Sequence, residues 1–149
     1  MRSLAILASA LLLAPPLLLA PAAARAADLA VTVEGVRNST GVVYVCLWSE
    51  ALTYPDCGKS VPHARRAIPP EGGSVRTVFD GLPPGTYAIS VLHDENGNGL
   101  LDSSMFGVPR EGFGFSRIPR LVALRAPTFE EASFRVEADG TVTITMIYF

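Results

Sequence analysis

The chain has 149 residues, of which 12 are Lys or Arg and 14 are Asp or Glu, so its formal net charge is −2. This length is enough for one domain with its own hydrophobic core. The mildly acidic balance argues against nucleic-acid binding, which needs a basic face to neutralise phosphates.

The N-terminus has the order of a secretory signal peptide. One arginine precedes an apolar run over 4–14, and small residues follow over 20–27. Two prolines directly after the run disfavour a permanent membrane helix, although an uncleaved anchor is the alternative. We therefore expect a signal peptide over 1–27, export to the periplasm or the extracellular space, and one domain over 28–149 with no membrane span after cleavage.

The exported part alternates short apolar runs with turns, which is typical of strands. Both faces of the run 42–49 are apolar, which predicts a central strand. Residues 50–73 hold four prolines and three glycines and indicate a long surface connection, and 105–120 indicate a second irregular stretch. The other predicted strands lie at 29–36, 74–80, 86–93, around Phe134 and Val136, and at 141–149. Together they predict an all-β fold, an antiparallel β-sandwich of about seven strands with long irregular loops.

Two cysteines, Cys46 and Cys57, lie at the end of a predicted strand and in the connection after it. Export places them where disulfides persist, and an even count at short separation predicts a bridge between them. Such a bridge would contribute about 2–3 kcal/mol of stability. The alternative is two free thiols, one of them buried.

The strand 86–93 runs into a segment in which oxygen-bearing side chains alternate with other residues. Its pattern, Asp-x-Asn-x-Asn-Gly-x-x-Asp, matches the first nine positions of a calcium loop, with Gly99 at the sharp turn. A hard divalent cation needs six to eight oxygens, and a chain coiling around it presents every second side chain inward. The predicted ligands are Asp94, Asn96, Asn98, the main-chain carbonyl of Leu100, and Asp102.

The twelfth position of the loop departs from the calcium pattern, because Met105 stands where a bidentate glutamate belongs. Glu111 or Glu95 is able to close the ligand shell instead. The expected affinity is that of extracellular modules, with Kd on the order of 10⁻⁴–10⁻³ M. An asparagine- and glycine-rich turn without an ion is the open alternative, because Asn-Gly pairs favour positive φ.

The stretch 79–116 resembles the hallmark of a family of secreted bacterial proteins known as domain of unknown function 2141. This resemblance extends to nearly all of the exported part and implies an exported β-sandwich, without supplying a mechanism. The segment "LPPGTYAISV" over 82–91 is also similar, more loosely, to prealbumin-like or immunoglobulin-like sandwiches, including surface-repeat modules. Some surface modules carry a calcium loop beside a strand, which implies ligand roles for the five residues named above.

These features favour a secreted non-enzymatic module that binds an unknown protein or envelope ligand and has calcium as its cofactor. Glu111, Phe113 and Phe115 are candidates to face that ligand, although core positions are the favoured interpretation for the two phenylalanines.

Two other functions stay open. A hydrolase would use His93 with its neighbouring carboxylates, but the sequence carries no nucleophile elbow, zinc signature or phosphate loop. A purely structural envelope protein would have no ion site.

Overall fold

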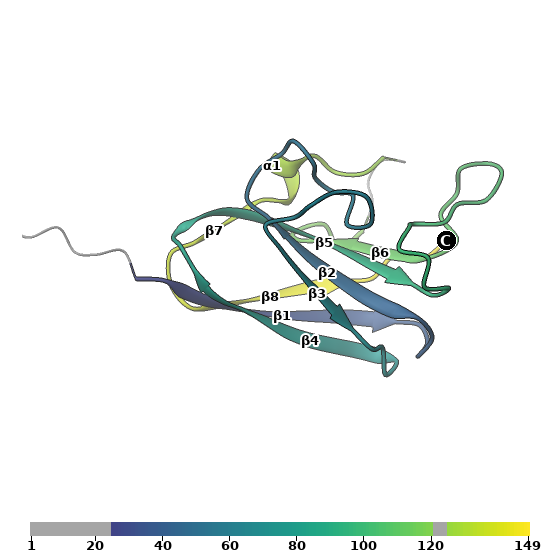
Figure 1. Ribbon diagram of the computed structural model, residues 1–149, viewed down its shortest axis with the longest axis horizontal. Helices are drawn as coiled ribbons and strands as arrows, with labels where there is room; N and C mark the ends of the chain where they lie inside the picture. The colour runs from purple at the N-terminus through teal and green to yellow at the C-terminus, as the bar shows by residue number, and fades with distance from the viewer. Residues whose placement is uncertain (1–24, 121–124) are drawn as a thin grey trace, which may run out of the picture.

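The computed structural model describes residues 25–120 and 125–149, which form two β-sheets packed face to face (Figure 1). The predicted signal peptide lies outside the described residues except for its last three positions. The elements are β1 (Ala27–Val36), β2 (Val42–Trp48), β3 (Ala64–Ile68), β4 (Gly73–Leu82), β5 (Gly85–Asp94), β6 (Gly112–Phe115), α1 (Phe129–Ala132), β7 (Phe134–Val136) and β8 (Gly140–Thr145). The predicted all-β sandwich is confirmed.

One sheet has the strand order β4-β1-β8, and the other has the order β3-β2-β5-β6, with β7 added alongside β5. The described strand pairs are antiparallel except β1 and β8, which run parallel with Leu29 opposite Gly140. This pairing joins the two ends of the described chain. It therefore depends on a contact between distant segments that no local pattern encodes.

The main core lies between the two sheets and takes alternate residues from each strand. On β1, Leu29, Val31 and Val33 point into it and are buried, while the residues between them are more exposed. This is the period-two pattern of a strand with one face covered. On β5, which lies within the predicted strand 86–93 and its flanks, Tyr87, Ile89 and Val91 fill the core from the opposite sheet.

A second buried cluster covers the outer face of the five-stranded sheet. Cys46, Trp48 and Leu92 point outward there and are covered by Cys57 and Tyr54 from the connection after β2 and by Phe129 at α1. Both faces of β2 are therefore buried, which confirms its prediction as a central strand between β3 and β5. Within the described ranges, no helix is long and apolar enough to cross a bilayer.

Two strands occupy segments that the sequence indicated to be irregular. The predicted connection over 50–73 is wrong for Ala64–Ile68, which is the edge strand β3 with two adjacent arginines. The predicted irregular stretch over 105–120 is wrong for Gly112–Phe115, which is β6. In both, glycine or arginine replaces the apolar residues that mark a strand. The last strand, predicted over 141–149, ends at Thr145 as β8, and Ile147 adds only an isolated bridge to Phe113.

Candidate functional site

The site lies where β5 ends, and it begins with two fully buried polar residues, His93 and Asp94. The Nε2 of His93 lies 2.9 Å from the main-chain carbonyl oxygen of Thr40, and its Nδ1 lies 2.8 Å from the hydroxyl of Tyr148. Because a carbonyl only accepts, Nε2 donates and Nδ1 is left to accept from the tyrosine. Both ring nitrogens of His93 are therefore engaged, one with the turn between β1 and β2 and the other with the C-terminal segment after β8.

Asp94 organises the first half of the loop with its carboxylate. Its Oδ1 accepts hydrogen bonds from the main-chain nitrogens of Gly97 at 2.8 Å and Asn98 at 3.2 Å, and its Oδ2 accepts one from Gly99 at 2.7 Å. Gly97 and Gly99 have φ angles of 75° and 78°, a region that favours glycine. The two glycines let the chain coil so tightly that three N–H groups point at one buried carboxylate.

Farther along the loop, two asparagine side chains each accept a hydrogen bond from the main-chain nitrogen two residues later. Asn96 Oδ1 accepts from the main-chain nitrogen of Asn98 at 3.0 Å, and Asn98 Oδ1 accepts from that of Leu100 at 2.8 Å. The Oδ2 of Asp102 accepts from the amide nitrogens of Asn96 at 2.5 Å and Asn98 at 2.9 Å. The side chains of the four predicted side-chain ligands are thus linked to one another or to the same turn of backbone.

Glu111 joins the loop from the start of β6 and closes it. Its carboxylate is 4% exposed, with Oε1 accepting from the main-chain nitrogen of Glu95 at 2.9 Å and Oε2 from that of Asp102 at 3.0 Å. One side chain therefore holds the second and the ninth positions of the loop together. Glu111 was predicted to face a ligand, and the structure places it against the loop.

Arg37 belongs to this site although nothing in the sequence pattern points to it. Its Nε donates to Glu95 Oε1 at 2.8 Å, and its Nη2 lies 2.5 Å from Glu95 Oε2 and 2.9 Å from the carbonyl oxygen of Arg110. The hydrogen bonds from Arg37, together with one from Asn38, hold the pKa of Glu95 below its ordinary value, and they outweigh the opposing effect of burial. Arg37 thus links the end of β1 to the start of the loop at Glu95 and to the backbone at Arg110, directly before Glu111.

The carboxylates of Asp94, Asp102 and Glu111 form no ion pair with any described cation. They also do not converge on one point: among residues 25–120 and 125–149, no three His, Cys, Asp or Glu side chains are placed to share a metal. Any cation in the loop would therefore draw on amide and main-chain oxygens as well as on carboxylates.

Beside the loop lies an apolar cavity of about 460 Å³. Phe113 and Phe115 of β6 line it together with Leu101, Val108 and Phe149. Both β6 phenylalanines are almost fully buried, so their side chains belong to the packed structure and at the same time form the cavity floor. The two readings of the sequence for these residues, core and ligand-facing, are compatible in this geometry.

Comparison with known proteins gives one match. Residues 31–145 match the family model described as "Uncharacterized protein conserved in bacteria (DUF2141)". The chain belongs to the DUF2141 family. No curated protein and no solved structure matches it. The family resemblance read from residues 79–116 is thereby confirmed.

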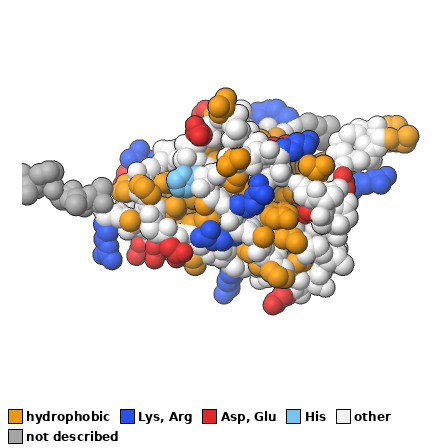
Figure 2. Space-filling view, in the orientation of Figure 1, with side chains coloured by type: hydrophobic (Ala, Val, Ile, Leu, Met, Phe, Trp, Pro, Cys, Tyr) orange, Lys and Arg blue, Asp and Glu red, His pale blue; other side chains and the backbone are white. Residues whose placement is uncertain are grey.

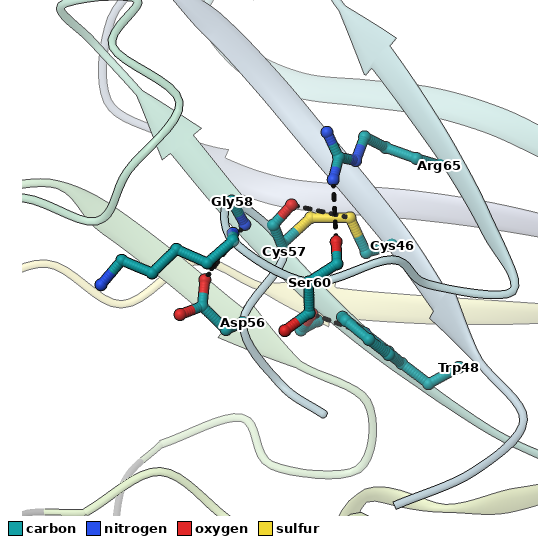
Figure 3. Close-up of a disulfide and its surroundings, with 9 residues drawn as sticks. Cys46, Trp48, Asp56, Cys57, Gly58, Ser60 and Arg65 are labelled. Atoms are coloured by element: carbon teal, nitrogen blue, oxygen red, sulfur yellow. Dashed lines mark hydrogen bonds between the residues drawn. A yellow bond between two sulfur atoms is a disulfide. The ribbon is translucent and has the colours of Figure 1, made fainter. Parts of the chain in front are cut away.

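The DUF2141 chain carries the predicted disulfide between Cys46 and Cys57, whose Cα atoms are 5.8 Å apart (Figure 3). The loop after Cys57 is compact, because Asp56 Oδ1 accepts from the main-chain nitrogens of Gly58 at 3.2 Å and Lys59 at 2.9 Å. Gly58 lies so close to the carbonyl oxygen of Gly99 that a Cβ at position 58 would overlap it. The disulfide-anchored loop therefore packs directly on the candidate ion loop.

Proposed function

We propose that this DUF2141 protein is an exported, non-enzymatic binding module whose loop over 94–102 holds a calcium ion. The observation that carries the proposal is the buried Asp94 carboxylate, which holds the main chain of the loop in a coil through three N–H groups. Such a coil turns alternate side chains to one side, which is the arrangement that a calcium loop needs.

The donor set fits a hard cation. An amide oxygen has two lone pairs, so the Oδ1 atoms of Asn96 and Asn98 each keep one after accepting a backbone N–H. The Oδ1 of Asp102 accepts no hydrogen bond from the described residues. With Asp94 and the carbonyl oxygen of Leu100, these groups supply oxygens of the types that calcium prefers.

Glu111 supports the proposal because it brings a carboxylate against a loop that lacks an acid at Met105. The chain leaves the loop after Asp102, forms a hairpin, and returns with the Glu111 carboxylate against the loop backbone. A bound calcium ion would neutralise carboxylates that have no cationic partner among the described residues. It would thereby stiffen the loop and the adjoining hairpin, which is the role that we assign to it.

Calcium titration by calorimetry, combined with thermal melting, tests the proposal. We expect a Kd on the order of 10⁻⁴–10⁻³ M. At a tenfold excess over Kd, binding to the folded state contributes about 1.4 kcal/mol, which raises Tm by roughly 4–6 °C in a domain of this size. Asp102→Asn keeps the shape of the side chain and should weaken binding at least about tenfold, because it removes one charged ligand.

The matched control is Asp80→Asn, which changes an exposed carboxylate on β4 whose only described ion-pair partner, Arg66, is 3.9 Å away. This variant should bind calcium like the unchanged protein. No heat of binding and no melting shift at millimolar calcium would show that the segment is a turn without an ion.

The non-enzymatic part of the proposal is supported by the bonding of His93. A general base must reach the substrate proton through a free nitrogen. Here one nitrogen is bonded to Thr40 and the other to Tyr148, and the ring has no exposed surface. A screen of ester, glycoside and phosphoester substrates tests this part, and activity that disappears in His93→Gln would support the hydrolase instead.

A further inference from the structure

The exposed large hydrophobic side chains of the described residues gather at one end of the sandwich. Six of the nine belong to the segment 100–108 or to the C-terminal residue, and they adjoin the candidate ion loop. These six are Leu100, Leu101, Met105, Phe106, Val108 and Phe149. A cluster of this kind marks an interaction site more often than scattered exposed residues do.

The most exposed members lie at the tip of a hairpin that projects from the sandwich. Met105 and Phe106 are 89% and 85% exposed. In Figure 1 a loop between β5 and β6 extends away from both sheets, and Figure 2 shows hydrophobic atoms at its far end with a cationic side chain close by. A folded protein gains nothing from holding two large apolar side chains in water at this distance from its core.

The hairpin has a defined conformation, because hydrogen bonds within its own backbone stabilise it. The main-chain nitrogen of Ser104 donates to the carbonyl oxygen of Val108 at 2.7 Å, and that of Arg110 donates to Asp102 at 2.8 Å. A further bond from Gly107 to the carbonyl oxygen of Ser104, at 2.9 Å, closes the tip. The exposure of the tip is therefore fixed by structure.

Three cationic side chains lie around this end, in addition to the carboxylates at the base of the hairpin. Arg125 and Lys59 each line one of two cavities that share Phe113 and Phe115 as lining residues, and Arg110 lies at the base of the hairpin. Arg125 pairs with Glu131, while Lys59 and Arg110 have no ion-pair partner in the described part of the chain. Each free cation near a membrane surface adds attraction to anionic lipid headgroups.

We propose that the hairpin tip inserts Met105 and Phe106 into the interface of an anionic phospholipid bilayer, with the nearby cations on the headgroups. A protein partner fits less well, because a stable protein interface buries about 1,200–2,000 Å² of well-matched surface. A narrow tip with two side chains does not offer such an area, whereas a soft apolar phase accepts a convex tip. The insertion stands on these exposed residues, and only its dependence on calcium rests on the proposed function.

Calcium dependence follows from charge. Asp94, Asp102 and Glu111 lie at the hairpin base without an ion-pair partner in the described residues, and they repel anionic lipid. A divalent cation in the loop offsets this repulsion. We therefore expect binding to be stronger with calcium than with a chelator.

Cosedimentation of the exported chain with vesicles tests the inference. The vesicles contain phosphatidylcholine with roughly one phosphatidylglycerol in three, or phosphatidylcholine alone as the neutral comparison. We expect binding in calcium to the anionic vesicles, at least about tenfold weaker for the double variant Met105→Ser with Phe106→Ser. The matched control is Leu52→Ser, which changes an equally exposed residue (89%) outside the cluster and should bind like the unchanged protein.

Tryptophan fluorescence measures whether the hairpin tip enters the bilayer. Phe106→Trp places an indole at the tip, while Trp48, the only other tryptophan, is buried, so its emission should not change when vesicles are added. Its emission should shift to shorter wavelength when anionic vesicles are added. An unshifted emission, equal binding of the serine double variant, or reversible self-association that the double variant abolishes would overturn the inference. Calorimetry without vesicles separates the two proposals: vesicle binding through the tip with no heat from calcium would leave the insertion standing and overturn the ion site.

Discussion

Glu111 accepts a hydrogen bond from the main-chain nitrogen of Asp102 at 3.0 Å, although a projecting hairpin separates the two residues along the chain. The same carboxylate accepts from Glu95 at 2.9 Å, so the base of the loop and the base of the hairpin share one acceptor. Because Glu111 bonds to both segments, a conformational change in the loop should alter the hairpin, and a change in the hairpin should alter the loop.

Replacing Glu111 by Gln should therefore loosen both segments. The amide nitrogen of glutamine cannot accept, so one of the two backbone N–H groups loses its partner inside a buried site. We expect the free energy of unfolding to fall by about 1–3 kcal/mol in urea titrations, and calcium affinity to fall with it. Glu71→Gln, at an exposed position, is the matched control and should leave both quantities unchanged.

Asp94 should be more important for folding than for ion affinity. Asp94→Ala leaves the N–H groups of Gly97 and Gly99 without an acceptor, while that of Asn98 keeps Asn96 Oδ1, so we expect a loss of about 2 kcal/mol or more. Millimolar calcium should not restore this stability, because the loop backbone that would hold the ion is no longer coiled. Urea unfolding with and without calcium measures both effects, and full rescue by calcium would contradict this role for Asp94.

Much of this site was readable from the sequence because its signals are local. The polar residues Asp94, Asn96 and Asn98, with Gly97 and Gly99, predict a tight loop or turn at the end of the strand. The structure has such a loop, and it adds the bonds from the side chains of Asn96 and Asn98 to the backbone two residues on. The buried strand before the loop was predicted for the same reason, because its period-two pattern is written in consecutive residues.

The parts that the sequence did not predict depend on contacts between distant residues. Arg37 and Glu95 are 58 positions apart, and no periodicity connects them. The strand β6 was missed because Gly112 and Gly114 suggested a loop. In the structure these glycines make room for the Tyr148 ring and the Ile144 side chain, which a Cβ would overlap. A glycine that marks a close approach between elements cannot be told from a loop glycine without the partner.

The pair of Arg37 and Glu95 should make stability depend on acidity. Because the folded state holds the pKa of Glu95 below its ordinary value of 4.5, the pair contributes fully above that pH, and the contribution is lost as pH falls through the lowered value. We expect Glu95→Gln to lower the free energy of unfolding by about 1 kcal/mol at pH 7 and to flatten its decline below pH about 4.5. Glu34→Gln changes a carboxylate that forms no ion pair with any described residue, and this control should keep the slope of the unchanged protein.

The first strand makes a prediction about processing. Ala27 is buried and lies opposite Leu82 in the β1–β4 pair, so it is part of the folded domain. If the N-terminal segment is removed on export, we expect cleavage after Ala24 or Ala26, earlier than the boundary at 27 that the sequence predicts, so that Ala27 stays in the mature chain. The mass of the exported protein measures this directly, and a chain that begins at Asp28 would contradict it.

The disulfide should stabilise the ion loop as well as the fold. Replacing both Cys46 and Cys57 by Ala removes a cross-link over 11 positions, which we expect to cost about 2–3 kcal/mol in urea unfolding. Without the cross-link, the loop that carries Gly58 is no longer held against the Gly99 carbonyl group. The ion loop loses this packing contact, so calcium affinity should fall as well. Gly58→Ala separates the two effects: the added Cβ overlaps the Gly99 carbonyl oxygen while the disulfide stays intact. This variant should lose calcium affinity with a smaller loss of stability, and unchanged affinity in both variants would show that the two loops are in contact without being coupled.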